Sequence, residues 1–340
     1  MNLLVTGGAG FIGANFVRTM LARRRGLTIT TVDALTYAGN LANLAELRDD
    51  PRHRFVRADI TDRAAIFSLL AEGFDAIVHF AAESHVDRSI EDSAPFLNTN
   101  VLGTGVLLDG ARRYGVARFL HVSTDEVYGS LDGTEQATEQ SPLRPTSPYA
   151  ASKAAADLLV LAYGATYGLD VVVTRCSNNF GPLQFPEKVI PLFVTNALAD
   201  QPLPLYGDGG NVRDWIFVED HCSALELLLD RGRRGETYNI GANNEWNNRD
   251  LTREILRRLG KPEDLIRRVA DRPGHDRRYA LDSAKLRRET GWTPQVSFFE
   301  GLERTIDWYR SNQSWWRAVK SGDYQRFYDL WYGDRLRSEA

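Results

Sequence analysis

The stretch VTGGAGFIG, residues 5–13, joins an apolar run to a segment whose apolar residues repeat at helical spacing over residues 11–25. Its glycines Gly7, Gly10 and Gly13 follow the spacing G-x-x-G-x-x-G. Glycines between a strand and a helix allow backbone N–H groups at the helix N-terminus to approach a pyrophosphate closely. The stretch therefore predicts a β-strand, a phosphate-binding turn and an α-helix.

Strand and helix patterns alternate beyond this turn. Short apolar runs predict β-strands at residues 2–6, 28–32, 54–58, 76–80, 119–122 and 170–174, with helices between them. This rhythm predicts an α/β fold with a Rossmann-type, doubly wound parallel sheet that is covered on both faces.

The regular alternation of strand and helix patterns ends after residue 177. The stretches NNFGPLQFPEKVIP and QPLPLYGDGG are rich in proline and glycine, which predicts long, shaped loops. We therefore expect a first domain over residues 1–177, with a return segment near 213–245, and a smaller second domain over residues 178–340.

A helix start is predicted near the C-terminus. Ser297 and Glu300 form the capping-box pattern S-F-F-E, and Leu302, Ile306 and Tyr309 then share one helical face. Five of the seven tryptophans follow residue 290, so the C-terminal part is predicted to pack against the rest of the chain.

Composition and charge argue against several classes of partner. The 41 basic and 45 acidic residues give a net charge of −4, which favours neither nucleic acid nor an anionic membrane. No apolar run approaches membrane-spanning length and the N-terminus has no basic leader, so we expect a cytoplasmic protein. Cys176 and Cys222 lack metal-ligand spacing, which predicts reduced thiols and no metal site.

Acidic residues end the second and third predicted strands. Asp33 follows Gly13 by 20 positions, where a carboxylate can bind a ribose 2′-hydroxyl. The same charge would repel a 2′-phosphate, so a dinucleotide site here favours NAD over NADP. Asp59 could meet the adenine or simply face solvent.

The segment TSPYAASKAAAD places Tyr149 and Lys153 four positions apart, on one face of a predicted helix. Ser147 could cap this helix, with Pro148 at its first position. A nearby ammonium and a positive nicotinamide ring would lower the pKa of Tyr149, and a phenolate can act as a base.

The glycine loop, the Ser/Thr pair at the end of a strand and the Y-x-x-x-K pattern together resemble the extended short-chain dehydrogenase/reductase family. The run STDEVYG, residues 123–129, is similar to the nucleotide-sugar 4,6-dehydratases, most closely to those that act on dTDP-glucose. Further similar stretches are VDALTYAGN, AAESHVDRS, RCSNNFGPLQFPEKVIP, VRDWIFVEDH and DRPGHDRRYALD. Phe180 stands where this family usually has tyrosine, which leaves the chemistry untouched.

This resemblance implies a lyase. It would use NAD to convert dTDP-glucose into dTDP-4-keto-6-deoxyglucose for deoxysugar biosynthesis, and it would form a homodimer. Hydride would leave C4, water would be eliminated across C5 and C6, and hydride would return to C6.

Two adjacent acids go beyond what sugar oxidation requires, because Ser/Thr, Tyr and Lys suffice for that step. The elimination needs one carboxylate to take the C5 proton and one neutral acid to protonate the departing C6 hydroxyl. Neighbouring carboxyls suit both tasks, because repulsion raises one apparent pKa while the other group stays ionised. The resemblance assigns Glu126 as the base and Asp125 as the acid, and places Thr124 at the C4 oxygen beside Tyr149.

The same residues bear on three other possible functions. A nucleotide-sugar 4-epimerase or a C6 decarboxylase needs no protonated acid at C6, so Asp125 argues against both. A non-catalytic protein that senses NAD should have lost Tyr149, Lys153 or the acids, and all of them are present.

The resemblance also implies which residues contact each ligand. The residues expected at the cofactor are Gly7, Gly10, Phe11, Ile12, Gly13, Asp33, Thr36, Gly39, Asp59, Ile60, Ala81, Ala82, Ser84, Thr99, Tyr149, Lys153 and Asn178. The residues expected at the nucleotide sugar are Ser84, His85, Arg88, Thr124, Asp125, Glu126, Asn179, Lys188, Val189, Pro204, Tyr206, Arg213, Asn248, Arg272, His275 and Tyr324. Arg213 and Arg272 suit bidentate phosphate contacts.

Overall fold

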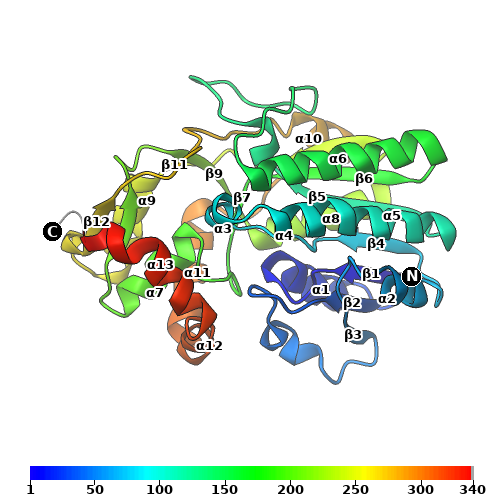
Figure 1. The fold of residues 1–340 in the computed structure, drawn as a ribbon, viewed down its shortest axis with the longest axis horizontal. Helices are drawn as coiled ribbons and strands as arrows, with labels where there is room; N and C mark the ends of the chain where they lie inside the picture. The colour runs from blue at the N-terminus through cyan, green and yellow to red at the C-terminus, as the bar shows by residue number, and fades with distance from the viewer. Residues whose placement is uncertain (338–340) are drawn as a thin grey trace.

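A seven-stranded parallel sheet forms the larger lobe of the computed structural model, which describes residues 1–337 (Figure 1). The strand order is β10-β6-β5-β4-β1-β2-β3, so the chain starts in the middle of the sheet and builds outward on both sides of β1. The predicted fold class is confirmed. The strands are β1 (Asn2–Thr6), β2 (Thr28–Asp33), β3 (His53–Arg57), β4 (Ala76–His79), β5 (Arg118–Thr124), β6 (Val171–Cys176) and β10 (Glu236–Ile240).

Helices cover both faces of this sheet. In β1, Leu3 and Val5 pack into one core with residues of α1 and α8, whereas Leu4 packs into a second core with residues of α2, α5 and α6. Successive side chains of a strand point to opposite faces, so a strand buried on both faces must be apolar throughout. The covering helices are α1 (Phe11–Arg23), α2 (Arg63–Leu70), α5 (Thr104–Arg113), α6 (Pro148–Tyr167) and α8 (Val218–Arg231).

A smaller lobe carries its own core, built around Phe180, Trp215 and Leu302. Two small sheets contribute to it, a three-stranded one of order β11-β9-β7 and a pair of β12 with β8. The strands are β7 (Asn178–Phe180), β8 (Leu203–Tyr206), β9 (Val212–Phe217), β11 (Glu245–Asn247) and β12 (Ile266–Val269). The main helices are α7 (Val189–Leu198), α9 (Asn248–Leu259), α11 (Phe298–Ser311), α12 (Gln313–Val319) and α13 (Asp323–Arg337).

The chain crosses between the lobes more than once. After β9 it returns to the large sheet through α8 and β10, where β10 pairs with β6, and α10 (Ala284–Thr290) packs against β10. The predicted division into domains at residue 178 stays a prediction. Shorter helical segments complete the connections: η1 (Leu41–Leu47), α3 (Val86–Glu91), α4 (Ala94–Phe96), η2 (Leu97–Gly103), η3 (Asp125–Tyr128) and η4 (Glu263–Leu265).

The structure differs from the sequence prediction where long loops were expected. Residues 178–180 and 203–206 form the short strands β7 and β8. Strands of three or four residues are too short to show a period of two, and their flanking prolines and glycines indicate loops. Pro204 is tolerated because β8 pairs only with β12 and lies in a two-stranded sheet.

The predicted helix start near the C-terminus is confirmed. The Ser297 side chain accepts a hydrogen bond from the Glu300 backbone N–H at 3.3 Å, and α11 begins at Phe298, directly after Ser297. Leu302, Ile306 and Tyr309 are all buried in the core of the smaller lobe. Both cysteines are free and buried. Within residues 1–337, no helix combines the length and apolar character that crossing a bilayer requires.

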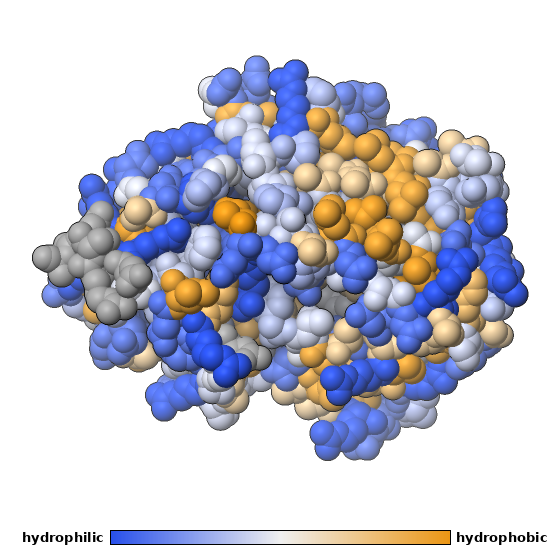
Figure 2. All heavy atoms as spheres, viewed as in Figure 1, coloured by the Kyte–Doolittle hydropathy of each residue, from blue (hydrophilic) through white to orange (hydrophobic). Residues whose placement is uncertain are grey.

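An apolar patch lies on the outer surface of the larger lobe, over α5 and α6 (Figure 2). Leu102 of η2 is 62% exposed and Leu158 of α6 is 58% exposed. Tyr167, at the end of α6, is half exposed as well. The α5, α6 and η2 segments pack on one another, so these side chains belong to one helical layer.

Substituting Leu302 tests the core of the smaller lobe. Leu302→Ala should lower the free energy of unfolding by about 2–5 kcal/mol, because it leaves a cavity in a fully buried site. Leu330→Ala is the matched control, since Leu330 is 65% exposed and its loss should change stability by less than about 0.5 kcal/mol. Urea unfolding measures both, and equal effects would contradict the assigned core.

Candidate active site

A cavity of about 390 Å³ opens along the carboxyl edge of the large sheet and extends into the smaller lobe. Its lining includes Gly7 after β1, Asp33 at the end of β2, Ala81 after β4 and Thr124 at the end of β5. The strand order reverses at β1, and the crevice at such a switch point is where open α/β sheets bind ligands.

The glycine loop is shaped by close backbone approach. Gly7 has a φ of +70°, and a Cβ there would lie 2.5 Å from the Ala81 nitrogen. A Cβ on Gly13 would lie 2.3 Å from the Gly7 oxygen, so the start of α1 sits directly against the turn. Within the described chain, no side chain caps the α1 N-terminus at Gly10. This turn fits a dinucleotide, because its N-terminal N–H groups face the cavity without a competing side chain.

Asp33 stands beside this turn as a buried carboxylate. Its Oδ2 accepts a hydrogen bond from the Ala9 N–H at 3.0 Å and its Oδ1 accepts one from the Leu35 N–H at 2.8 Å. Burial raises the pKa of Asp33, and these backbone donors oppose that shift. A Cβ on Gly39 would lie 2.6 Å from Oδ1, so the following loop folds closely over this acid.

Tyr149 and Lys153 project from the first turns of α6. As predicted, Ser147 caps this helix, with its Oγ accepting from the Ala150 N–H at 3.1 Å, and Pro148 is its first residue. The buried Lys153 ammonium donates to the Val122 carbonyl at 2.8 Å, and burial lowers its pKa to about 8.

The expected direction of the Tyr149 pKa shift is wrong for the protein alone. Burial, followed by the nearby charge of Glu126, raises the pKa of this phenol well above its usual value. The expected lowering depended on a positive nicotinamide ring as well as on Lys153. A hydrogen bond with Thr124 lowers the pKa of Tyr149, but this effect is smaller than that of burial.

Asp125 and Glu126 begin the short helix η3 directly after β5. Thr124 caps this turn, accepting from the Glu126 N–H at 3.3 Å and donating to the Asp125 Oδ1 at 3.2 Å. Asp125 is 3% exposed, and its Oδ2 is buried without a hydrogen-bond partner among residues 1–337. Burial and then Glu126 raise the pKa of Asp125 well above its ordinary value, although Arg213 opposes the shift. Burial and the neighbouring Glu126 therefore favour the neutral form of the Asp125 carboxyl.

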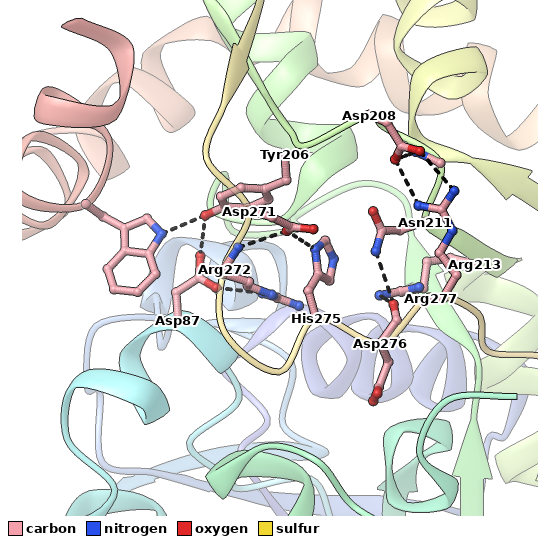
Figure 3. A network of polar contacts seen from close by, with 12 residues as sticks. Asp87, Tyr206, Asp208, Asn211, Arg213, Asp271, Arg272, His275, Asp276 and Arg277 are labelled. Carbon is pink, nitrogen blue, oxygen red and sulfur yellow. Dashed lines mark hydrogen bonds and ion pairs between the residues drawn. The ribbon is translucent and has the colours of Figure 1, made fainter. Parts of the chain in front are cut away.

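The smaller lobe contributes a polar network to the cavity (Figure 3). The Arg272 guanidinium donates to the Asp87 Oδ1 at 2.6 Å, and the Tyr206 hydroxyl donates to the Asp87 Oδ2 at 3.0 Å. Asp87 thereby fixes two side chains of the smaller lobe to α3 of the larger one. His275 contacts Asp271 through its Nδ1 at 2.5 Å and meets the Tyr206 ring edge-on.

Arg213 is a buried cation at the seam between the lobes. Its guanidinium donates to the carbonyls of Val212 at 2.8 Å and Asp276 at 3.0 Å, and it stacks on Tyr279 at 4.2 Å. Among the side chains that the structure describes, Arg213 forms no ion pair, and its hydrogen bonds go to backbone carbonyls. Lys188 likewise donates only to a carbonyl, that of Ser84 at 2.8 Å. These cations leave positive charge in the cavity that suits a diphosphate.

Polar atoms without partners mark the rest of the cavity. Buried and unpartnered among the described residues are Asn178 Oδ1, His85 Nδ1, Asn248 Oδ1 and Arg272 Nε. Buried polar groups are nearly always hydrogen-bonded in folded proteins. All four residues line the same cavity, so their unpartnered atoms indicate ligand contacts there.

Nearly all predicted site residues line this cavity, with two exceptions. The Arg88 guanidinium lies between the rings of Tyr37 and Phe327, outside the lining. The Tyr324 hydroxyl donates to the Pro186 carbonyl at 2.8 Å, also outside it.

Sequence reasoning missed several lining residues with polar or aromatic side chains. They are Glu83, Asp87, Cys176, Gln184, Glu187, Trp215, Tyr279 and Tyr332. Asp87 lies inside the quoted stretch AAESHVDRS, next to Arg88, so its position in the motif was visible. The stretch does not reveal which of the two neighbours faces the cavity.

Comparisons with known proteins agree with this geometry. The model of the GDP-mannose 4,6 dehydratase family matches residues 4–305. The chain is 53% identical over 328 residues to a dTDP-glucose 4,6-dehydratase of Streptomyces niveus, covering 95% of this chain and 97% of that one. It is 57% identical over 325 residues to a dTDP-glucose 4,6-dehydratase of Streptomyces antibioticus, covering 94% of this chain and 96% of that one.

A solved structure is similar to this chain in both fold and sequence. The dTDP-glucose 4,6-dehydratase DesIV of Streptomyces venezuelae, solved with NAD bound, superimposes with a TM-score of 0.92 at 57% identity, covering 94% of this chain and 100% of that one. The resemblance inferred from the sequence is confirmed. The chain belongs to the nucleotide-sugar 4,6-dehydratase family, a family of hydro-lyases, in the branch of the dTDP-glucose 4,6-dehydratases.

Proposed function

We propose that this protein uses NAD to convert dTDP-glucose into dTDP-4-keto-6-deoxyglucose. The observation that carries the proposal is the buried Asp125 carboxyl, whose pKa is raised by burial and by the adjacent Glu126, at the end of β5 and in the same cavity as Tyr149 and Lys153. The choice of substrate is supported by relatives named dTDP-glucose 4,6-dehydratases, which are identical to this chain at more than half of the aligned positions.

The cofactor site fits NAD. When bound, NAD supplies the hydride acceptor for C4 and the hydride donor for C6. The glycine turn, whose helix start has no side-chain cap, would hold the pyrophosphate through its N–H groups, and the buried Asp33 would accept from the adenosine ribose hydroxyls. The same carboxylate repels a 2′-phosphate, which disfavours NADP.

Tyr149 and Thr124 assist the oxidation at C4. Thr124 holds the C4 oxygen, and Tyr149 takes its proton as the carbonyl forms. Because burial raises the pKa of the phenol, phenolate needs positive charge nearby. Lys153, buried one helical turn away, is the cation that the chain supplies.

Elimination falls to the two acids. The new C4 ketone acidifies the C5 proton, which Glu126 removes, and the C5–H electrons form the C5–C6 double bond. As the C6–O bond breaks, Asp125 donates its proton and the hydroxyl leaves as water. A proton returned to C5 and the hydride at C6 then complete the product, with no net redox change.

The second half of the cavity holds the nucleotide diphosphate. Arg213 and Lys188 donate to backbone carbonyls and form no ion pair with the side chains that the structure describes, so their charges are available to the phosphates. Arg272, held by Asp87, presents its remaining donors in a fixed orientation.

A cytoplasmic location in a deoxysugar pathway follows from this proposal. The product is a 6-deoxy sugar nucleotide, and both cysteines are free thiols, as in a reducing compartment. Cell fractionation tests the location, and recovery outside the cytoplasm would contradict it.

A product assay tests the function as a whole. Purified protein should convert dTDP-glucose to a 4-keto-6-deoxy product faster than it converts UDP-, CDP- or GDP-hexoses, as followed by NMR. Formation of a C4 epimer, or no turnover of any nucleotide hexose, would contradict the proposal.

Single substitutions should separate oxidation from elimination. Asp125→Asn and Glu126→Gln should keep C4 oxidation but lose about 10²–10⁴-fold in product formation, because each removes one proton-transfer group. Stopped-flow absorbance should show reduced nicotinamide accumulating in both variants. Tyr149→Phe should show no such burst.

Tyr163→Phe is the matched control for the tyrosine. Tyr163 lies on the same helix, and its hydroxyl donates to Asp109 rather than into the cavity. This variant should behave as the parent does. If the acid variants form no reduced nicotinamide, the division of roles is wrong.

We also propose a homodimer that buries the apolar patch over η2, α5 and α6 (Figure 2). Pairing this face with its copy would remove Leu102 and Leu158 from water, as a two-fold helical interface does. Sedimentation should show a dimer at micromolar concentration, and Leu158→Glu should shift it to monomer. Leu330→Glu, at an equally exposed site elsewhere, should leave the dimer intact. A monomeric parent protein would contradict the proposal.

A further inference from the structure

Arg88 lies in an aromatic sandwich outside the cavity. Its guanidinium carbon is 4.1 Å from the centroid of the Tyr37 ring and 4.1 Å from that of Phe327. Arg88 belongs to α3, Tyr37 to the loop after β2, and Phe327 to α13. The stack therefore joins three segments that are distant in sequence, two on the larger lobe and one at the C-terminal end of the chain.

Glu187 closes the edge of this sandwich. Its Oε1 accepts from the Tyr37 hydroxyl at 3.3 Å, and its Oε2 lies 3.8 Å from the Arg88 Nε. The Glu187 side chain is only 6% exposed. Phe185, from the same segment, packs edge-on against the Tyr37 ring. Tyr37 is thus held on its face, its edge and its hydroxyl by groups from outside its own loop.

The loop that carries Tyr37 forms part of the cofactor side of the cavity. Its residues Thr36, Ala38 and Gly39 line the cavity beside Asp33. Backbone hydrogen bonds hold its later part, through the Gly39 N–H to the Thr36 carbonyl and the Asn40 N–H to the Ala9 carbonyl. The Tyr37 side chain fastens the middle of the loop to α3, residues 185–187 and α13.

We propose that Arg88 is a positioning residue, whose stack between Tyr37 and Phe327 locks loop 34–40 over bound NAD and sets how slowly the protein releases it. This inference rests on the proposed function, in which NAD is the cofactor. The reaction restores NAD in every turnover, so no step requires its release. A loop that is held closed over NAD therefore does not slow the turnover.

The geometry opposes a direct contact between Arg88 and the nucleotide sugar. Both faces of the guanidinium are covered by rings, and its Nε side faces Glu187. A planar guanidinium can stack on two rings at once, which the compact ammonium of lysine cannot do. The stack is consequently sensitive to the substitution that keeps the charge.

Arg88→Lys tests the inference through the release rate of NAD. Protein loaded with labelled NAD is mixed with excess unlabelled NAD, and the retained label is followed over time after rapid gel filtration. Release should be about tenfold faster than in the parent, since both cation–π contacts weaken. The matched control is Arg63→Lys, because Arg63 stacks on Phe67 at 4.4 Å on α2, away from the cavity. This control should release NAD at the parental rate.

Phe327→Leu provides a second variant if Arg88→Lys does not fold. It removes one ring from the sandwich through a residue of α13, so it should also accelerate release. The Phe327 ring also packs edge-on against His85, so the release rate of NAD, and not the activity, is the readout. A parental release rate in the variant that folds overturns the inference. A parental release rate in Arg88→Lys together with a raised KM for dTDP-glucose would instead assign Arg88 to the substrate. If the parent protein holds no NAD, the proposed function itself fails.

Discussion

The burial of the Asp125 carboxyl beside Glu126 is the constraint on which the site depends. A carboxylate in an apolar setting next to a second negative charge is unfavourable, so burial and Glu126 raise the pKa of Asp125. The structure places this acid where a sheet edge meets a second lobe, with its Oδ2 unpartnered and facing a cavity. In the proposed mechanism, this acidic pair, which is costly for folding, serves as a proton donor beside a proton acceptor.

The two lobes contribute different chemistry to this position. In the proposed mechanism, the carboxyl edge of the large sheet and α6 supply the groups for oxidation and elimination, whereas the smaller lobe supplies cations. Arg213 links the two, because it sits on β9 of the smaller lobe and its charge acts on Asp125. Asp87 provides a second link, from α3 to Arg272 and Tyr206 (Figure 3). The relative position of the lobes therefore controls both the charge balance and the volume of the cavity.

Sequence reasoning succeeded where a residue's position is fixed by local rules. The short apolar runs, the helical period, the glycine turn and the Ser147 cap predicted the sheet, α1 and the start of α6, and thereby the placement of Tyr149 and Lys153. It failed where tertiary packing decides. Local pattern does not determine whether Asp87 or Arg88 turns into the cavity, and strands as short as β7 show no period. The Tyr149 pKa was predicted from neighbouring charges, whereas burial dominates it in the protein.

The fate of the hydrogen at C4 tests the central claim most directly, because Asp125 and Glu126 matter only if oxidation at C4 is followed by elimination and reduction at C6. With dTDP-[4-²H]-glucose and the intact protein, deuterium should reappear at C6 of the same product molecule. In heavy water, C5 should gain one solvent deuterium through the exchange of protons on Glu126. NMR and mass spectrometry of the product report both positions. Deuterium that stays at C4, or that is lost to solvent, would contradict a dehydratase mechanism and leave the buried acid without a role.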